Sequence, residues 1–151
     1  MNTIDIEPHE IATPLSDEKI LLFLDDVCSA LSLEGKEISL QFCDDEHIKA
    51  LNNTYRDIDE PTDILSFPQQ EKIDIEFPCD TALLGDMVIS IDTLKRNAKY
   101  FKVDEAVELK RILIHGMLHL VGYDHETNDS AEPMIKYQES LLIVLLRTDV
   151  K

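Results

Sequence analysis

Apolar residues along the chain follow two spacings, one typical of strands and one typical of helices. Alternation of apolar and polar residues predicts strands at residues 3–7 and 37–43. Two further short strands are predicted at residues 61–68, where a proline stands at each end, and at residues 83–90. Apolar residues that recur every three or four positions predict helices at residues 16–34, 45–55, 92–100, 104–121 and 131–147.

Side chains suited to capping mark several helix ends. Ser16 and Asp104 are expected to cap the N-termini of the first and fourth helices, and Asp92 that of the third. Gly35 and Gly122 follow the last apolar positions of the first and fourth helices, where a residue with positive φ is favoured. We therefore expect these two glycines to end their helices.

The order of these elements indicates the fold class. Helices interleaved with a few strands are typical of a sheet with helices packed on it, and 151 residues suit one domain that buries a core without disulfides. We predict a single α+β domain over residues 1–151, with a small mixed four-stranded sheet and about five helices. The acidic segment 69–81 is expected to form a flexible loop or a weak edge hairpin.

Cysteine content and hydropathy bear on the compartment in which the protein works. Cys28, Cys43 and Cys79 are dispersed and odd in number, which favours free thiols in a reducing compartment. The start of the chain has no basic segment followed by an apolar one, and the longest apolar run, from Leu141 to Leu146, is too short to span a bilayer. We expect a cytoplasmic protein without membrane association.

The run HGMLHLVGYDH at residues 115–125 carries the main chemical signal. His115 and His119 stand four positions apart, so in a helix both imidazoles project from one face. A turn at Gly122 would bring His125 to the same point. Three imidazoles suit one Zn2+ ion and leave its fourth tetrahedral position for water, as in catalytic sites. The alternatives are histidines without a metal, or a structural zinc, which normally has four protein ligands.

The spacing of this run matches that of the metzincin metalloproteases, with one difference. Gly116 follows the first histidine, where those enzymes carry the glutamate that accepts a proton from water. Efficient peptide hydrolysis would therefore lack its general base.

The run at residues 115–125 also resembles HGxLHLxGYDH, the signature of the YbeY family of zinc-dependent, single-strand-specific endoribonucleases. Two further segments resemble the family in the same order, LNNTYRDIDEPTDILSFP at residues 51–68 and LLGDMVIS at residues 83–90. The resemblance implies a hydrolase of phosphodiester bonds that matures ribosomal RNA, including the 3′ end of the small-subunit RNA, and acts in ribosome quality control. It implies single-stranded RNA and the ribosome or its small subunit as partners.

Two side chains near these motifs are candidates for catalysis. The Arg56 guanidinium presents a planar fork of donors that matches phosphate oxygens, although most arginines in polar segments are ordinary surface residues. Asp124 could orient an imidazole, accept a proton from water, or only stabilise its turn. A zinc-bound hydroxide and an RNA 2′-hydroxyl are the other possible routes for the proton.

Three more positions in these segments have expected roles. Gly116 is expected to leave space for an RNA backbone or a neighbouring helix to approach the metal. Ser66 and Asp86 lie in the segments that resemble the family, and capping or turn hydrogen bonds are expected of them.

The formal net charge of −17 is unusual for a protein that binds RNA, because phosphates favour basic surfaces. Residues 95–111 differ from the rest, since basic side chains there outnumber acidic ones. We predict a small basic patch beside the metal helix, with a solvated helix surface as the alternative. The basic residues are Lys95, Arg96, Lys99, Lys102, Lys110 and Arg111, and the acidic ones are Asp104, Glu105 and Glu108.

Two other classes of function stay open at this point. One is a zinc hydrolase of another substrate, such as a peptide, which the missing glutamate disfavours. The other is a ribosome assembly factor whose metal is only structural, which the acidic composition favours.

Overall fold

Four strands form one mixed sheet in the computed structural model, which describes residues 2–69, 83–124 and 132–148. The strands lie in the order β1-β2-β4-β3. β1, β2 and β4 are parallel to one another, and β3 is antiparallel to β4. The strand bounds are β1 Thr3–Ile6, β2 Glu37–Cys43, β3 Ile64–Pro68 and β4 Leu83–Ser90. The predicted α+β class with a mixed four-stranded sheet is confirmed.

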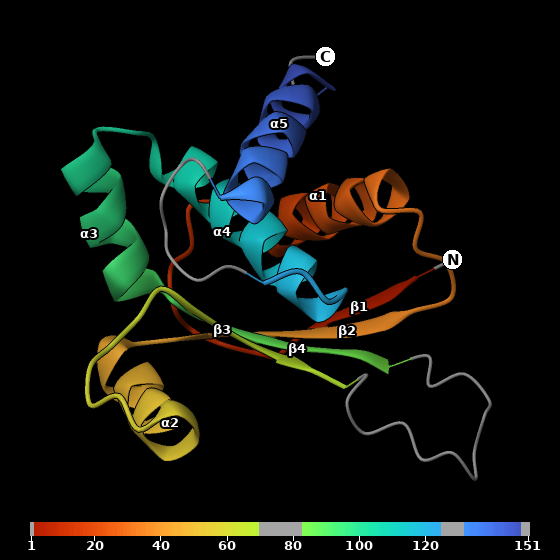
Figure 1. Cartoon of the computed structure of the whole chain (residues 1–151). Helices are drawn as coiled ribbons and strands as arrows, with labels where there is room; N and C mark the ends of the chain where they lie inside the picture. The colour runs from red at the N-terminus through yellow and green to blue at the C-terminus, as the bar shows by residue number, and fades with distance from the viewer. Residues whose placement is uncertain (1, 70–82, 125–131, 149–151) are drawn as a thin grey trace, which may run out of the picture.

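Helices cover the two faces of this sheet unequally (Figure 1). α1 and α4 lie over one face with α5 packed against α4, whereas α2 lies on the opposite side. None of the helices in the described residues is long and apolar enough to cross a membrane. The helix bounds are α1 Asp17–Ala30, α2 Asp45–Arg56, α3 Ile91–Phe101, α4 Glu105–Leu120 and α5 Pro133–Thr148.

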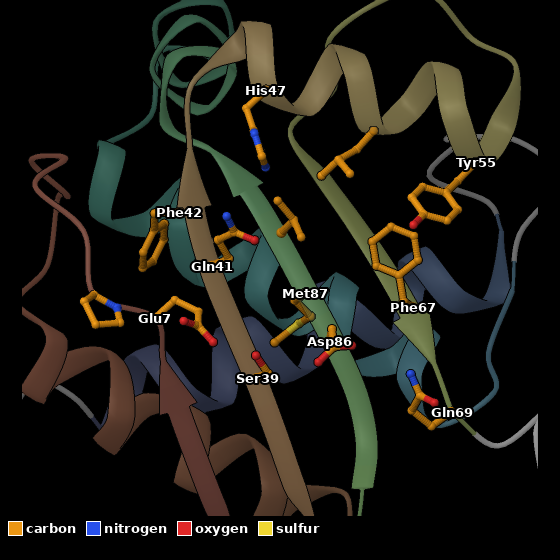
Figure 2. Close-up of a pocket in the computed structure, with 13 residues that line it drawn as sticks. Glu7, Ser39, Gln41, Phe42, His47, Tyr55, Phe67, Gln69, Asp86 and Met87 are labelled. Carbon is orange, nitrogen blue, oxygen red and sulfur yellow. The ribbon is translucent and has the colours of Figure 1, made fainter.

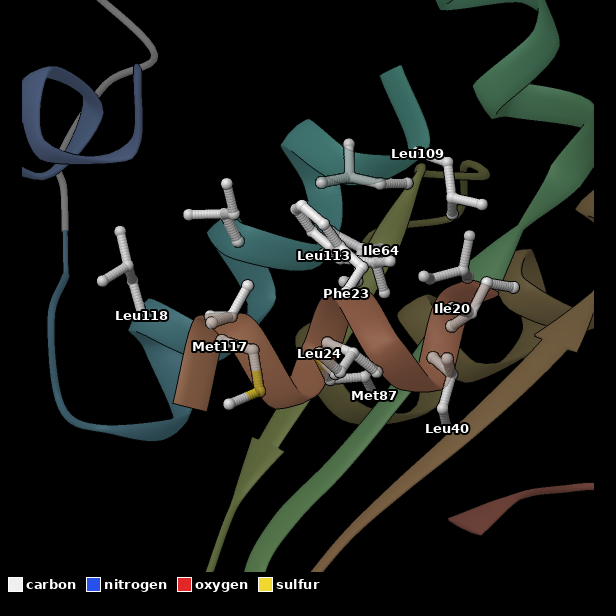
Figure 3. Close-up of a cluster of buried hydrophobic side chains, with 14 of the residues drawn as sticks. Ile20, Phe23, Leu24, Leu40, Ile64, Met87, Leu109, Leu113, Met117 and Leu118 are labelled. Carbon is white, nitrogen blue, oxygen red and sulfur yellow. The ribbon is translucent and has the colours of Figure 1, made fainter. Parts of the chain in front are cut away.

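The main core lies between the sheet and helices α1, α4 and α5. Figure 3 shows side chains of α1, α4 and the strands that meet there, among them Leu24, Met87 and Leu113, each fully buried. α4 is buried on most of its circumference, because α1, α3 and α5 pack around it above the sheet. A helix held on so many sides presents its remaining side chains at fixed positions.

The capping predictions for α1 and α4 are confirmed at their N-termini. The Ser16 side chain accepts a hydrogen bond from the Lys19 N–H, and the Asp104 side chain accepts one from the Ala106 N–H at 2.7 Å. At the other end of α4, Gly122 has a φ of +107°, as the predicted helix end requires.

Two other helix ends differ from the predictions. Ser90, and not Asp92, is the N-cap of α3, because the strand β4 runs directly into that helix. Asp92 lies in the first turn, where its carboxylate accepts a hydrogen bond from the Asp45 N–H at 3.1 Å. α1 ends at Ala30, before the predicted stop at Gly35, which lies in the connection to β2 with a φ of +69°.

Cys28 and Cys43 are buried free thiols, as predicted. Burial is the main cause that raises the pKa of Cys28 to about 11 and the pKa of Cys43 to about 12, so both thiols stay protonated at neutral pH. Cys79 and the predicted loop or hairpin at residues 70–81 lie outside the described residues.

Candidate metal centre

The last two turns of α4 bring two histidine rings together. The Nε2 atoms of His115 and His119 lie 3.2 Å apart, and the ring centroids are 4.7 Å apart. The helix ends just beyond them in a Schellman motif, in which the Gly122 N–H donates to the His119 carbonyl and the Tyr123 N–H donates to the Leu118 carbonyl. The predicted one-turn spacing of the two imidazoles is therefore present.

The facing nitrogens have a separation that suits a shared ion. Two imidazoles bound to one tetrahedral Zn2+ with Zn–N bonds of about 2.0–2.1 Å have nitrogens about 3.4 Å apart. The separation of 3.2 Å between the His115 and His119 Nε2 atoms is close to that value. Within the described ranges no three His, Cys, Asp or Glu side chains gather for a metal. His125, the predicted third ligand, lies outside those ranges.

A cavity of about 320 Å3 opens beside the two histidines. Arg56 and Asp124, the two predicted catalytic residues, both line this cavity with His115 and His119. A neighbouring hollow of about 370 Å3 shares Arg56, His119 and Asp124 with it. Among the described residues, the first cavity is lined by Arg56, Thr62, Asp63, Ile64, Ser66, His115, His119 and Asp124.

Arg56 reaches the cavity because α2 ends at that residue. Asp57 adopts the left-handed conformation with a φ of +57°, and the Ile58 N–H donates to the Asn52 carbonyl. The buried Asn52 side chain also donates to the Glu60 carbonyl at 2.9 Å and so fixes the loop that follows. Arg56 itself is exposed and sits at the negative end of the helix dipole, which favours a cation.

β3 supplies the wall of the cavity opposite α4. The Ser66 hydroxyl lies 3.4 Å from the Gly116 carbonyl oxygen and donates to it. A Cβ atom on Gly116 would lie 2.6 Å from both the Ile64 Cδ1 and the Met87 Sδ atoms. The space at Gly116 is therefore used by strands β3 and β4 rather than by a neighbouring helix, which was one of the two predicted uses; the approach of an RNA backbone stays a prediction. Ser66 lines the cavity beside the histidines, whereas the sequence predicted only a capping or turn hydrogen bond for it.

Asp86 does not join the histidines. It lines a separate cavity of about 540 Å3 on the other face of the sheet, together with Ser39 and Gln41 of β2. Figure 2 shows these side chains below α2, which contributes His47 and Tyr55. Asp86 and the two histidines thus line cavities on opposite faces of the sheet, since neighbouring strand residues point in opposite directions.

A polar network behind His115 was not predicted. The His115 Nδ1 lies 2.6 Å from the Gln138 Oε1, and the Gln138 Nε2 donates to Glu139 at 3.0 Å. Glu139 accepts two hydrogen bonds from the Arg111 Nε, and Arg111 also donates to Glu108 at 2.9 Å. A polar residue at position 138, between the buried Met134 and Leu142 of α5, is the signal in the sequence that could have revealed it.

Burial shapes the ionisation of this network. Burial is the first cause that raises the pKa of Glu108, although the hydrogen bond from Arg111 opposes it. For Arg111, burial alone would lower the pKa, but the hydrogen bonds to Glu139 and Glu108 outweigh it and raise that pKa. The guanidinium is therefore charged at every physiological pH.

The predicted basic patch is smaller in the structure. Arg111 forms ion pairs with Glu108 and Glu139, and Arg96 forms one with Asp45 at 2.6 Å. Lys110 is buried, with its Nζ 5.5 Å from the centre of the Phe23 ring. The other three basic side chains, Lys95, Lys99 and Lys102, are exposed.

Comparison with known proteins agrees with the resemblance in the histidine run. The family described as endoribonuclease YbeY matches residues 5–145, and this chain belongs to that family. The endoribonuclease YbeY of Treponema denticola is 48% identical over 121 residues, which are 80% of this chain and 78% of the relative. The endoribonuclease YbeY of Aquifex aeolicus is 39% identical over 126 residues, which are 83% of this chain and 81% of the relative.

A solved structure has the same overall arrangement. The solution structure of TM1509 from Thermotoga maritima matches with a TM-score of 0.62 at 26% sequence identity. The match covers 99% of this chain and 93% of that chain. The α+β fold is thus shared along nearly the whole chain.

Proposed function

We propose that this protein is a zinc-dependent endoribonuclease that cuts single-stranded RNA. The observation that carries the proposal is the pair of facing imidazoles, His115 and His119, in a cavity that also contains Arg56 and Asp124. Relatives that are named endoribonuclease YbeY support RNA as the substrate. We further propose that it acts in the cytoplasm on ribosomal RNA, at the ribosome or its small subunit, including the 3′ end of the small-subunit RNA and in ribosome quality control.

The proposed zinc ion would be held by His115, His119 and His125. When bound at such a site, zinc polarises a phosphoryl oxygen and acidifies water, lowering its pKa toward about 7. The donor set supports zinc because imidazole nitrogens suit this metal, and both described rings present Nε2 toward each other at 3.2 Å.

Arg56 is proposed to bind the phosphate that is cleaved. Arg56 lines the same cavity as the histidines, and its guanidinium carries two parallel N–H donors that can meet two phosphate oxygens. The charge also stabilises the extra negative charge that develops on phosphorus in the transition state. Asp124, which lines both hollows beside His119, is proposed to accept the proton of the attacking hydroxyl or water.

A peptidase is less well supported by the same site. Position 116 would carry the general base of a metzincin-type protease, and glycine has no side chain there. The atoms that surround Gly116 leave no room for a carboxylate, since even a Cβ would approach Ile64 and Met87 to 2.6 Å. We therefore expect no efficient peptide hydrolysis.

Cleavage of labelled RNA by the purified full chain tests this function. We expect zinc-loaded protein to cut single-stranded RNA, to spare a duplex of the same sequence, and to lose activity with a chelator until zinc is restored. Generic peptide substrates should stay intact. Zinc-dependent peptide hydrolysis without RNA cleavage would replace the proposal with a protease. Zinc binding without any cleavage, combined with normal ribosome maturation by a His119→Ala variant, would favour an assembly factor.

A further inference from the structure

We infer that Gln138 is a positioning residue for the proposed metal site, because it fixes which ring nitrogen of His115 carries hydrogen. The inference rests on the proposed function, since it concerns the ability of His115 to bind an ion. Gln138 lies on α5 and His115 on α4, and the Gln138 Oε1 is 2.6 Å from the His115 Nδ1. Gln138 does not belong to the cavity lining among the described residues, so it acts through His115.

The direction of each hydrogen bond follows from Arg111. A guanidinium only donates, so the Glu139 oxygens that it contacts at 3.0 and 3.2 Å must accept. The same carboxylate lies 3.0 Å from the Gln138 side chain, which must therefore turn its NH2 group toward it. The amide oxygen of Gln138 then faces His115, and an oxygen can only accept.

The consequence for His115 is a single neutral tautomer. Its Nδ1 must carry the hydrogen that the Gln138 Oε1 accepts, which leaves the lone pair on Nε2. That Nε2 is the atom that faces the Nε2 of His119 at 3.2 Å. A metal ligand needs its lone pair directed at the ion, so the network prepares His115 for binding before any metal arrives.

The two buried members of the network restrict its motion. Gln138 is 5% exposed and Glu108, at the far end, is 4% exposed, whereas the side chains of Arg111 and Glu139 are 26% and 41% exposed. Arg111 and His115 lie one turn apart on α4, so the helix itself sets the spacing between these two residues. Water competes poorly for buried hydrogen bonds, and an amide that loses its partner there is costly. The amide of Gln138 consequently has one favourable orientation.

The tautomer can be measured without metal and without activity. In 15N-resolved NMR of the metal-free full chain, wild-type His115 should show a protonated Nδ1 and an unprotonated Nε2 when the ring is neutral. A protonated Nε2 as the main neutral form in the wild type would overturn the inference without any variant.

Two substitutions at Gln138 distinguish its role as hydrogen-bond acceptor from a role in packing alone. Gln138→Leu and Gln138→Glu both remove the donor to Glu139, but only glutamate returns an acceptor to the His115 Nδ1. We expect Gln138→Leu to mix the two tautomers and to weaken zinc binding by roughly 10–100-fold. Gln138→Glu should keep the Nδ1-protonated form and most of the zinc affinity. Ser140→Ala, on the exposed side of α5, serves as the control and should match the wild type.

The outcomes distinguish this inference from the proposed function. Equal losses of zinc affinity in the Leu and Glu variants, with an unchanged His115 tautomer, would make Gln138 a packing residue and refute its positioning role. A protein with the expected tautomer and zinc affinity that cleaves no RNA would refute the proposed function alone. Normal RNA cleavage with no tautomer preference in the wild type would refute the positioning role alone.

Discussion

Replacing Gly116 with alanine tests how closely α4 approaches the sheet. In an exposed helix interior, this change stabilises a protein by about 1 kcal/mol, because glycine has a low helix propensity. At position 116 we expect the opposite. The new Cβ would lie 2.6 Å from the Ile64 Cδ1, 2.6 Å from the Met87 Sδ and 3.2 Å from the Ser66 Oγ. Ile64 and Met87 are buried, so neither can move into solvent.

The size of the effect follows from two opposing contributions. Overpacking of a core costs about 1–3 kcal/mol, and two close contacts place Gly116→Ala toward the upper end of that range. Helix propensity returns about 1 kcal/mol. We expect a net loss of about 2 kcal/mol in the free energy of unfolding. With a denaturant slope of about 2 kcal/mol/M, the urea midpoint should fall by about 1 M.

A double-mutant cycle identifies the cause. Ile64→Val removes the Cδ1 atom that the new Cβ would meet, and by itself should cost about 1 kcal/mol. Combined with Gly116→Ala, the valine should cost less than it does alone, with a coupling of at least about 0.5 kcal/mol. Urea unfolding followed by circular dichroism measures all four proteins. A Gly116→Ala protein as stable as the wild type, or more stable, would refute the close approach of α4 to β3 and β4.

Three further predictions concern the metal, the phosphate and the carboxylate of Asp45 at the start of α2. His119→Ala should lose bound zinc, measured by elemental analysis of folded protein, whereas the control His47→Ala on α2 should retain it. Zinc retained in the His119→Ala variant would rule out the site. Arg56→Ala should keep its zinc and its fold but lose most RNA cleavage, and Arg56→Lys should recover only part of the cleavage activity. A wild-type cleavage rate in Arg56→Ala would make Arg56 an ordinary surface residue. Burial alone would raise the pKa of Asp45, but hydrogen bonds from Thr93, Arg96 and Ser90 outweigh it and lower that pKa below 3.8. Asp45→Asn should therefore be less stable by about 1–3 kcal/mol at pH 7. A carboxyl group whose pKa is lower in the folded state than in the unfolded state stabilises the fold at a pH above the unfolded-state pKa. This stabilisation is lost as the pH falls through the folded-state pKa, so the stability difference between the wild type and Asp45→Asn should shrink below about pH 4. An unchanged difference at pH 3 would contradict this.

Local patterns in the chain predict most elements of the fold and part of the site. Helix and strand positions follow from apolar spacing, which is a property of neighbouring residues, so the prediction of four strands and of a helix that carries His115 and His119 was correct. The spacing of His115 and His119 and the stop at Gly122 are equally local, because a helix places residues four apart on one face. Asp92 was assigned wrongly as a cap because nothing local indicates that β4 continues directly into α3.

The surroundings of the histidines depend on packing between elements and could not be predicted from local patterns. Ser66 of β3 and Gln138 of α5 each contact a residue of α4, and Arg56 at the end of α2 lines the same cavity as the histidines, so elements distant in the sequence supply these residues. The same packing pairs Arg111, predicted as part of a basic surface patch, with Glu108 and Glu139, and leaves its side chain only 26% exposed. Such contacts depend on how whole faces fit together, whereas helix spacing and caps depend on a few adjacent residues. The spacing of the two histidines could therefore be predicted from the chain, while the residues that surround them became apparent only in the folded protein.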